Sequence, residues 1–528
     1  MRPNDTWQTL WELARDIPVV DAHTHVQDDL PDFTEAAARA NLAGTQAEVN
    51  RPSAEVVAES LRRGRHARRT MLDATHGLFY SWFAAVAEGA TGRLDQAIAM
   101  VGSNTDSERR RAGRFLLEQL RDARYSEYAE WLRTMYGHYA RPAGPSGSDA
   151  SRGADLLDPA GFDTLWDAVA ARRHDPAFAE GILRQHGIRA YVTSIENRAD
   201  APSPPPVHPQ DVNLEFSLHP ESWSMFDCHP LIWPERATDA GLFLQGHRFQ
   251  AERYLLHLQE YFQQEIANAD QLQDAVQAFF LKILRSPRTN PRSRVLYVNC
   301  FQAEDWRFSG PYSRAVVDDA IRNHRDQLDG ERRRQVILCV AEAMLGALNR
   351  IGKEYKDQGE RFGCCLQMCG GATHFMDWER QVQSLPAPIP RLAQDEYPVW
   401  ARYPHVHFEY ICAHEGLYRD LSNAAKQVAN VSVGPWWHLF RRKRIAAMVS
   451  DQLTMGSVAS IACGFTDARF VEMIGAKYQS LRRAVVDAVA ELVDDPSSAL
   501  HGNVEGAAAL MEDLLFTNPA AVHHIPLG

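Results

Sequence analysis

The chain has 528 residues, of which 45% are hydrophobic and 23% are charged, so it is long enough to bury one large core. A formal net charge of −12 argues against binding to the phosphate backbone of nucleic acid. No apolar run reaches the roughly 18 residues of a membrane span, and the first residues lack the apolar core of a secretory signal. Eight cysteines without regular spacing favour a reducing, cytoplasmic location.

The first elements are predicted to be a short helix, a strand and a long helical region. Residues 5–15 carry apolar side chains at helical spacing. The run 17–23, Ile-Pro-Val-Val-Asp-Ala-His, is typical of a buried parallel strand. Residues 30–185 are mainly helical in pattern, and we interpret them as a helical insertion after the first strand.

The rest of the chain alternates short apolar strands with longer amphipathic helices. This alternation indicates a parallel sheet with crossover helices, and the strands suffice for a closed barrel. We therefore predict an α/β fold, a (β/α)₈ TIM-like barrel forming a single domain over residues 1–528. The predicted strands span 188–193, 294–298, 362–367, 405–410, 428–433 and 460–465, and the helices span 247–285, 331–352, 418–429, 439–455 and 469–494.

Two His-x-His pairs are candidates for a metal site, His23 with His25 and His405 with His407. Side chains two apart on a strand share a face, so both imidazoles of a pair can bind one cation. The first pair lies at the carboxyl end of its strand, where barrel enzymes carry their chemistry. We therefore assign the first pair to the metal and interpret the second as packing.

Several segments resemble a known enzyme superfamily. Residues 19–26, Val-Val-Asp-Ala-His-Thr-His-Val, resemble the first-strand signature of the amidohydrolase superfamily. Residues 430–437, ending in Trp-Trp, and residues 464–470, Gly-Phe-Thr-Asp-Ala-Arg-Phe, are similar to segments of uronate isomerases, the aldose–ketose isomerases of hexuronates. The pair Arg482–Arg483 in the following helix fits the same family. The resemblance extends from about residue 17 to residue 490.

The resemblance implies a divalent metal, with Zn²⁺ as the first choice, and a sugar acid as substrate. Histidine and aspartate also suit Mn²⁺, Fe²⁺ and Co²⁺, so the sequence leaves the metal open. By this resemblance the metal ligands are His23, His25 and Asp467, the residues acting in catalysis are Asp467, Arg469 and His76, and the substrate-binding residues are Arg236, His374 and Trp437.

The segment 366–374 departs from the family pattern Leu-Gln-x-His-x-Gly-Ala-x-Arg. Cys369 stands in place of the histidine and His374 in place of the arginine. Cys369 could be a nucleophile, a soft ligand or a small buried side chain. A histidine lacks the two-pronged grip of arginine on a carboxylate, so the substrate can differ from glucuronate and galacturonate.

Three functions remain open from the sequence. The first is isomerisation of a hexuronate or related sugar acid, which we adopt. The second is a one-metal hydrolase or lyase acting on a small carboxylated substrate, and the third is a sugar-acid binder without catalysis.

Without the resemblance, Asp467 would be interpreted as the N-cap of the helix 469–494 and His76 as a packed helix residue. We expect no nucleic-acid or membrane partner, and homo-oligomerisation stays open.

Overall fold

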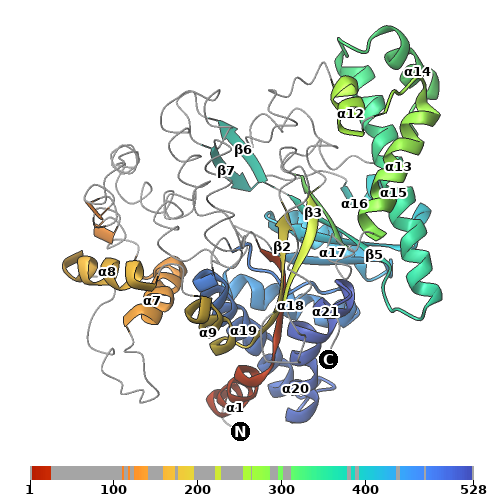
Figure 1. Cartoon of the computed structure of the whole chain (residues 1–528). Coiled ribbons are helices and arrows are strands. Elements are labelled where there is room, and N and C mark those ends of the chain that lie inside the picture. Colours follow the sequence, from red (N-terminus) through yellow and green to blue (C-terminus); the bar gives the residue numbers. More distant parts are fainter. Residues whose placement is uncertain are drawn as a thin grey trace.

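Figure 1 shows the computed structural model of the chain, which has the termini near one end of the strands. The structure describes residues 3–24, 124–140, 159–172, 176–195, 221–227, 254–262, 264–285, 295–300, 311–370, 372–376, 382–386, 392–435, 441–468 and 471–525, with a few single positions between 110 and 118.

Seven strands form one parallel sheet in the order β1-β2-β3-β4-β5-β8-β9. Each adjacent pair is parallel, as crossover connections through helices require. This confirms the prediction of an α/β fold. The strands are β1 (Val19–Thr24), β2 (Ile188–Ile195), β3 (Glu221–Asp227), β4 (Val295–Cys300), β5 (Cys364–Gly370), β8 (Val406–Cys412) and β9 (Val431–Pro435).

The segment 461–468 lies between the two edge strands of this sheet. Ile461 forms a parallel bridge with Val433 of β9, and Ala468 forms one with Thr24 of β1. The strand predicted here forms these isolated bridges instead of a regular ladder. The segment therefore brings the last strand of the sheet and the first into contact with one piece of chain.

Helices occupy the described connections between the strands. They are α1 (Pro3–Asp16), α7 (Glu127–Ala140), α8 (Phe162–Arg172), α9 (Pro176–Gln185), α12 (Tyr254–Phe262), α13 (Ala269–Arg285), α14 (Arg314–Asn323), α15 (Gly330–Asp357), α16 (Leu392–Arg402), α17 (Glu415–Ala425), α18 (Arg442–Met455), α19 (Val471–Asp494), α20 (Val504–Glu512) and α21 (Asn518–Val522).

The structure differs from the predicted elements in three places. The helix predicted over 247–285 is two helices, since Asn268 accepts a hydrogen bond from the Gln271 backbone N–H and caps α13. The strand β3 is rich in polar residues and was not predicted. A two-stranded antiparallel sheet of β6 (Ala372–Met376) and β7 (Val382–Pro386) was also missed.

The predicted helical insertion is described only in part. The helices α7, α8 and α9 lie between β1 and β2 in the chain, within the range 30–185 that was predicted as a helical insertion. Most of residues 30–126 lie outside the described part of the chain, so the extent of the insertion stays a prediction.

Alternating side chains of β5 face two different cores. Cys364, Leu366 and Met368 pack in the cluster that contains α13 and α15. Cys365 and Cys369 point to the opposite face of the sheet, which we call the inner face. They pack there in a smaller inner cluster, which also holds Ala520, Val522 and Ile525 from the carboxyl-terminal segment. The terminal segment around α21 therefore packs on the inner face of the sheet, near the lower strand ends in Figure 1.

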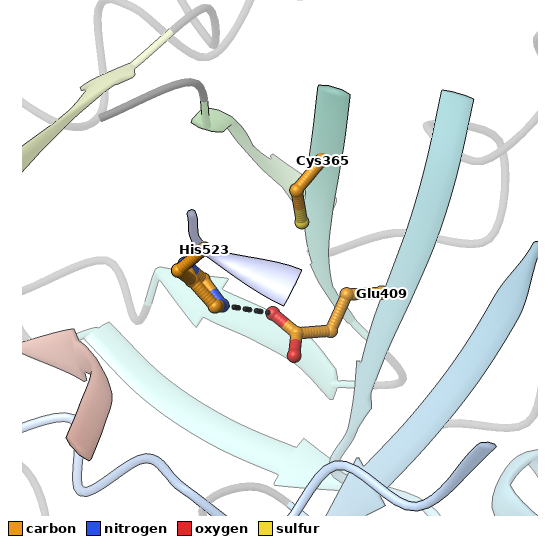
Figure 2. Close-up of side chains that lie close together, drawn as sticks. All are labelled: Cys365, Glu409 and His523. Carbon is orange, nitrogen blue, oxygen red and sulfur yellow. Dashed lines mark hydrogen bonds and ion pairs between the residues drawn. The ribbon is translucent and has the colours of Figure 1, made fainter. Parts of the chain in front are cut away.

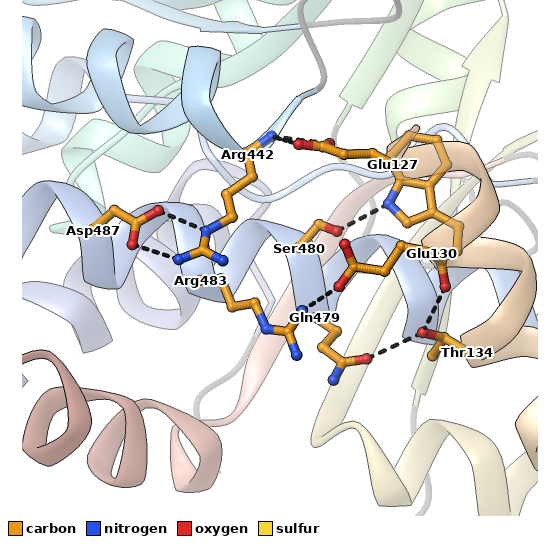
Figure 3. A network of polar contacts seen from close by, with 9 residues as sticks. Glu127, Glu130, Thr134, Arg442, Gln479, Ser480, Arg483 and Asp487 are labelled. Carbon is orange, nitrogen blue, oxygen red and sulfur yellow. Dashed lines mark hydrogen bonds and ion pairs between the residues drawn. The ribbon is translucent and has the colours of Figure 1, made fainter. Parts of the chain in front are cut away.

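Polar contacts attach α7 to α19 and α18 (Figure 3). The backbone N–H of Arg442 donates to both carboxylate oxygens of Glu127, at 2.8 and 3.0 Å. The Arg442 guanidinium binds Asp487 with two hydrogen bonds of 2.7 and 2.8 Å. Arg483, one of the paired arginines, binds Glu130. These contacts hold α7, which belongs to the region between β1 and β2, against α18 and α19.

The other paired arginine, Arg482, acts on the backbone. It is buried and donates to the carbonyl oxygens of Arg15, Ile17 and His186 at 2.7–2.9 Å. These carbonyls precede β1 and β2, so α19 sets where the two strands begin. Five donors in a rigid fork suit arginine to this role.

The helix α15 has the length and hydropathy of a membrane span, alone among the helices in the described ranges. Of its apolar window, a share of 67% is buried inside the protein. It packs against α13 in the large core, as a core helix of a soluble protein does.

The close approach of α15 to the start of β8 generates a prediction for glycine variants. A Cβ at Gly352 would lie 1.9 Å from the backbone oxygen of His405, whereas one at Gly181, in the exposed part of α9, would meet nothing within 4 Å. Alanine stabilises a helix by about 1 kcal/mol relative to glycine. We expect Gly181→Ala to gain up to that amount and Gly352→Ala to lose roughly 1–3 kcal/mol by overpacking.

Urea unfolding of both variants measures these changes. The midpoint should shift, and the slope of the unfolding free energy against urea concentration should stay the same. A Gly352→Ala variant as stable as Gly181→Ala would contradict the close packing of α15 on the sheet.

Candidate functional site

The first strand and segment 461–468 are joined through the buried carboxyl group of Asp21. Asp21 accepts hydrogen bonds from the backbone N–H of Thr466 at 2.9 Å and from its hydroxyl at 2.5 Å. Burial raises the pKa of Asp21 to about 8, although the Thr466 hydrogen bonds act in the opposite direction. Lys477 of α19 donates to the Thr466 carbonyl from the other side. Thr466 is therefore held on both its donor and its acceptor groups.

This arrangement brings Asp467 opposite His23. The backbone N–H of Asp467 donates to the carbonyl of His23 at 2.9 Å, and Asp467 Oδ1 lies 3.4 Å from His23 Nε2. Asp467 has a φ of +53°, a left-handed conformation that is uncommon for residues other than glycine. Strained backbone of this kind clusters at functional sites. Asp467 lies four residues before α19 begins, which is not the position of an N-cap.

Gln367 of β5 sets the orientation of the His23 ring. Its amide nitrogen donates to the Ala22 carbonyl at 3.2 Å and to Glu409 Oε2 at 2.6 Å, so the amide oxygen faces His23 Nδ1 at 2.6 Å. Because that oxygen can only accept, Nδ1 carries a proton and Nε2 is the ring nitrogen directed at Asp467. Such a partner on the second nitrogen is typical of a metal-binding histidine.

Glu409 of β8 continues the same hydrogen-bonded chain into the interior. It is buried and lies 3.0 Å from Nε2 of His523, at the carboxyl terminus. Burial raises the pKa of Glu409, but the attraction of His523 and the hydrogen bonds from His523 and Gln367 outweigh it, so its pKa lies below the ordinary value. An ionised Glu409 in turn keeps the Gln367 amide in its orientation.

The geometry of His23 and Asp467 fits a bound divalent cation. A tetrahedral zinc site with bonds of about 2.0–2.1 Å to nitrogen and oxygen places neighbouring ligand atoms about 3.4 Å apart. The separation of His23 Nε2 and Asp467 Oδ1 is 3.4 Å. Both residues lie at the carboxyl end of β1 and are almost fully buried, so these two atoms can serve as adjacent ligands of one ion.

The other sequence-predicted site residues are placed only in part. Five of them lie outside the described residues, namely His25, His76, Arg236, Trp437 and Arg469. His374 lies in β6, where its backbone pairs with Ser384, and its side chain is outside the description. Cys369 is buried in the inner apolar cluster, in agreement with a small packed side chain. His407 is buried and bonded to Ser432, in agreement with packing.

Sequence reasoning missed three residues that organise this site. Asp21, Gln367 and Glu409 each lie on an inner position of a strand and bind a neighbouring element. A polar side chain within an apolar strand was the available signal. It does not identify the partner, since Asp21 and Thr466 are 445 residues apart.

Comparison with solved structures shows which proteins share this fold. The glucuronate isomerase from Caulobacter crescentus superposes with a TM-score of 0.64 and 13% identity over 100% of this chain and 95% of that chain. The uronate isomerase from Thermotoga maritima gives 0.62 and 13% over 98% and 97%. The uronate isomerase from Bacillus halodurans gives 0.58 and 14% over 99% and 98%. The chain therefore has the fold of uronate isomerases.

No model of a known protein family matches the chain, and no curated protein matches it in sequence. The likeness is thus one of fold, and the chemistry must be argued from the site itself.

The link between Asp21 and Thr466 predicts unequal effects of two substitutions at Thr466. Thr466→Val removes the hydroxyl and leaves a buried Asp21 oxygen without that donor, which costs about 1–3 kcal/mol. Thr466→Ser keeps the hydroxyl and loses one methyl group, worth about 0.8 kcal/mol. Urea unfolding of both variants measures the difference. Equal stability of the valine variant and the unmodified protein would show that the hydroxyl does not hold Asp21.

Proposed function

We propose that the chain is a metal-dependent isomerase that interconverts the aldose and ketose forms of a hexuronate or related sugar acid. The observation that carries this proposal is the facing pair of His23 Nε2 and Asp467 Oδ1, in a fold shared with uronate isomerases. We further infer that the sheet closes as a (β/α)₈ barrel through segment 461–468, because that segment bridges both edge strands.

The metal site of this proposal combines described residues with one outside the description. His23 and Asp467 supply two ligand atoms, and His25, two residues along the same strand end, supplies the third. A divalent cation, with zinc as the first choice, supplies Lewis-acid polarisation of the substrate's carbonyl oxygen. Gln367 keeps the Nδ1 proton of His23 in place, which leaves Nε2 as the donor atom for the ion.

Asp467 is the proposed base for the proton transfer. Its carboxylate would take the proton from C2 of the open-chain aldose while the C1 oxygen takes a proton from water, which gives an enediol. Asp467 would then return its proton to C1 as the C2 hydroxyl releases its proton to water, and the ketose results. The Asp21–Thr466 contact fixes the backbone of Asp467, so the carboxylate need not be reoriented between the two transfers.

The remaining predicted residues complete the substrate site in this proposal. Arg469 and Arg236 would bind the carboxylate of the sugar acid bidentately, and His76, His374 and Trp437 would contact its hydroxyls and ring face.

The reduced thiols of Cys339, Cys365, Cys412 and Cys463 support a cytoplasmic location.

The proposed base predicts a specific loss of turnover. Asp467→Asn removes a metal ligand and the proton acceptor, so we expect conversion of glucuronate or galacturonate to the keto acid to fall at least 10²–10⁴-fold, roughly the contribution of a general base. Asp451→Asn, on the exposed side of α18, is the matched control and should keep full activity. The assay follows keto-uronate formation by zinc-loaded protein.

A zinc-loaded protein that converts no hexuronate would remove the proposal. Transfer of ¹⁸O from solvent into the product of a carboxylated substrate would select the hydrolase instead.

The orienting role of Gln367 predicts weaker metal binding without it. Gln367→Leu leaves His23 Nδ1 without its acceptor, and losing such a partner typically costs 10–100-fold in metal affinity. Met368→Leu, on the opposite face of β5, should bind the metal normally. Competition with a chromophoric chelator measures both affinities. Unchanged affinity in Gln367→Leu would mean that His23 is oriented by another group or is not a ligand.

A further inference from the structure

A second group of side chains that could hold a metal ion lies on the inner face of the sheet (Figure 2). Cys365, Glu409 and His523 offer a sulfur, a carboxylate oxygen and a ring nitrogen, all within 4.8 Å of one another. All three residues are buried, with at most 3% of each exposed. Figure 2 shows the Cys365 sulfur directed toward the space between Glu409 and His523.

Three elements far apart in the chain build this cluster. Cys365 is the second residue of β5, and Glu409 is the fourth residue of the neighbouring strand β8. In the ladder Cys365 pairs with His407 and Gln367 pairs with Glu409, so both side chains point to the inner face at adjacent levels. His523 follows α21, whose Ala520 and Val522 pack in the inner cluster.

The cluster lies at a different level of the sheet from the proposed catalytic metal. Cys365 is near the amino end of β5, whereas His23 is the fifth of the six residues of β1 and Asp467 follows at the same end. Gln367 separates the two groups, because it binds His23 on one side and Glu409 on the other. The two sites therefore share no ligand.

The ligand types suit zinc or a similar ion. Thiolate, imidazole and carboxylate are the three donor groups that zinc takes in proteins, at about 2.3, 2.0–2.1 and 2.0–2.2 Å. His523 Nε2 and Glu409 Oε2 are already 3.0 Å apart, close to the separation of two ligands on one ion. The Cys365 sulfur lies within 4.8 Å of a ligand atom of each of these two residues.

Two buried ring nitrogens near the cluster have no hydrogen-bond partner within the described part of the chain, Nδ1 of His523 and Nδ1 of His407. His407 is the residue paired with Cys365 in the ladder, and Ser432 contacts its other nitrogen at 2.9 Å. A buried polar atom without a partner costs free energy, and ligation is one way to satisfy it. His407 is not one of the three residues whose ligand atoms come together, so its Nδ1 is not assigned to the site.

We propose that Cys365, Glu409 and His523 form a second, structural zinc site that ties the carboxyl-terminal segment to the inner face of the sheet. A buried site with sulfur, nitrogen and oxygen ligands resembles structural zinc centres, which take all their ligands from the protein. Binding would release the thiol proton of Cys365 as the thiolate forms, so that the ion holds β5, β8 and the end of α21 together.

Cobalt loading of the whole chain tests the site. The metal-free protein is titrated with Co²⁺, and metal content and the absorption spectrum are recorded. We expect two Co²⁺ per chain and a thiolate-to-cobalt charge-transfer band in the near ultraviolet. Cys365→Ser should abolish the band and leave one Co²⁺, while Cys412→Ser, a buried cysteine of β8 that faces the outer core, should change neither.

Further variants keep the outcome decisive. His523→Gln should also lose one Co²⁺, and His25→Ala should lose the other ion while keeping the charge-transfer band, so failure of the proposed catalytic site is distinguishable from failure of this one. A wild-type protein that binds one Co²⁺ without the band, or a band that persists in Cys365→Ser, would overturn the proposal. Either result would leave Glu409 and His523 as a buried ion pair only.

Discussion

The site depends on one contact, the pair of hydrogen bonds by which Asp21 of the first strand holds Thr466. Apart from the facing side chains of His23 and Asp467 and the apolar packing of Val20 with Phe465, the other links between segment 461–468 and β1 are backbone contacts. The contact is buried, so solvent cannot compete for the hydrogen bonds, and Lys477 fixes the same residue from α19. The left-handed backbone of Asp467 is tolerated because the preceding residue, Thr466, is held by Asp21 and by Lys477.

A second constraint runs across the inner face of the sheet. From Asp467 the contacts pass through His23, Gln367 and Glu409 to His523, and each of these side chains is buried. Such a network is stabilising only when each member has its partners, because an unpaired buried polar group costs free energy. The carboxyl terminus thereby influences the orientation of a histidine near the amino terminus. The proposed metal ligand His23 and the terminal segment around His523 are therefore coupled through the amide side chain of Gln367, which binds both His23 and Glu409.

Part of this fold and site could be predicted from the sequence. Short apolar runs located β2, β4, β5, β8 and β9, and the His-Thr-His motif marked the carboxyl end of the first strand as the candidate site. The polar strand β3 could not be predicted, since its sequence lacks that pattern. The missed roles of Asp21 and Gln367 were invisible for another reason: their partners lie hundreds of residues away, and only the folded sheet brings them together. Asp467 was predicted from the resemblance, and its carboxylate lies 3.4 Å from the His23 ring, while its role stays a prediction.

We propose that one cation lies between the first strand and segment 461–468. Anomalous diffraction at the zinc absorption edge, from crystals of the zinc-loaded chain, locates such an ion. We expect a peak about 2.0–2.2 Å from both His23 Nε2 and Asp467 Oδ1. A map without a peak between these two atoms, with zinc bound elsewhere or not at all, would contradict it.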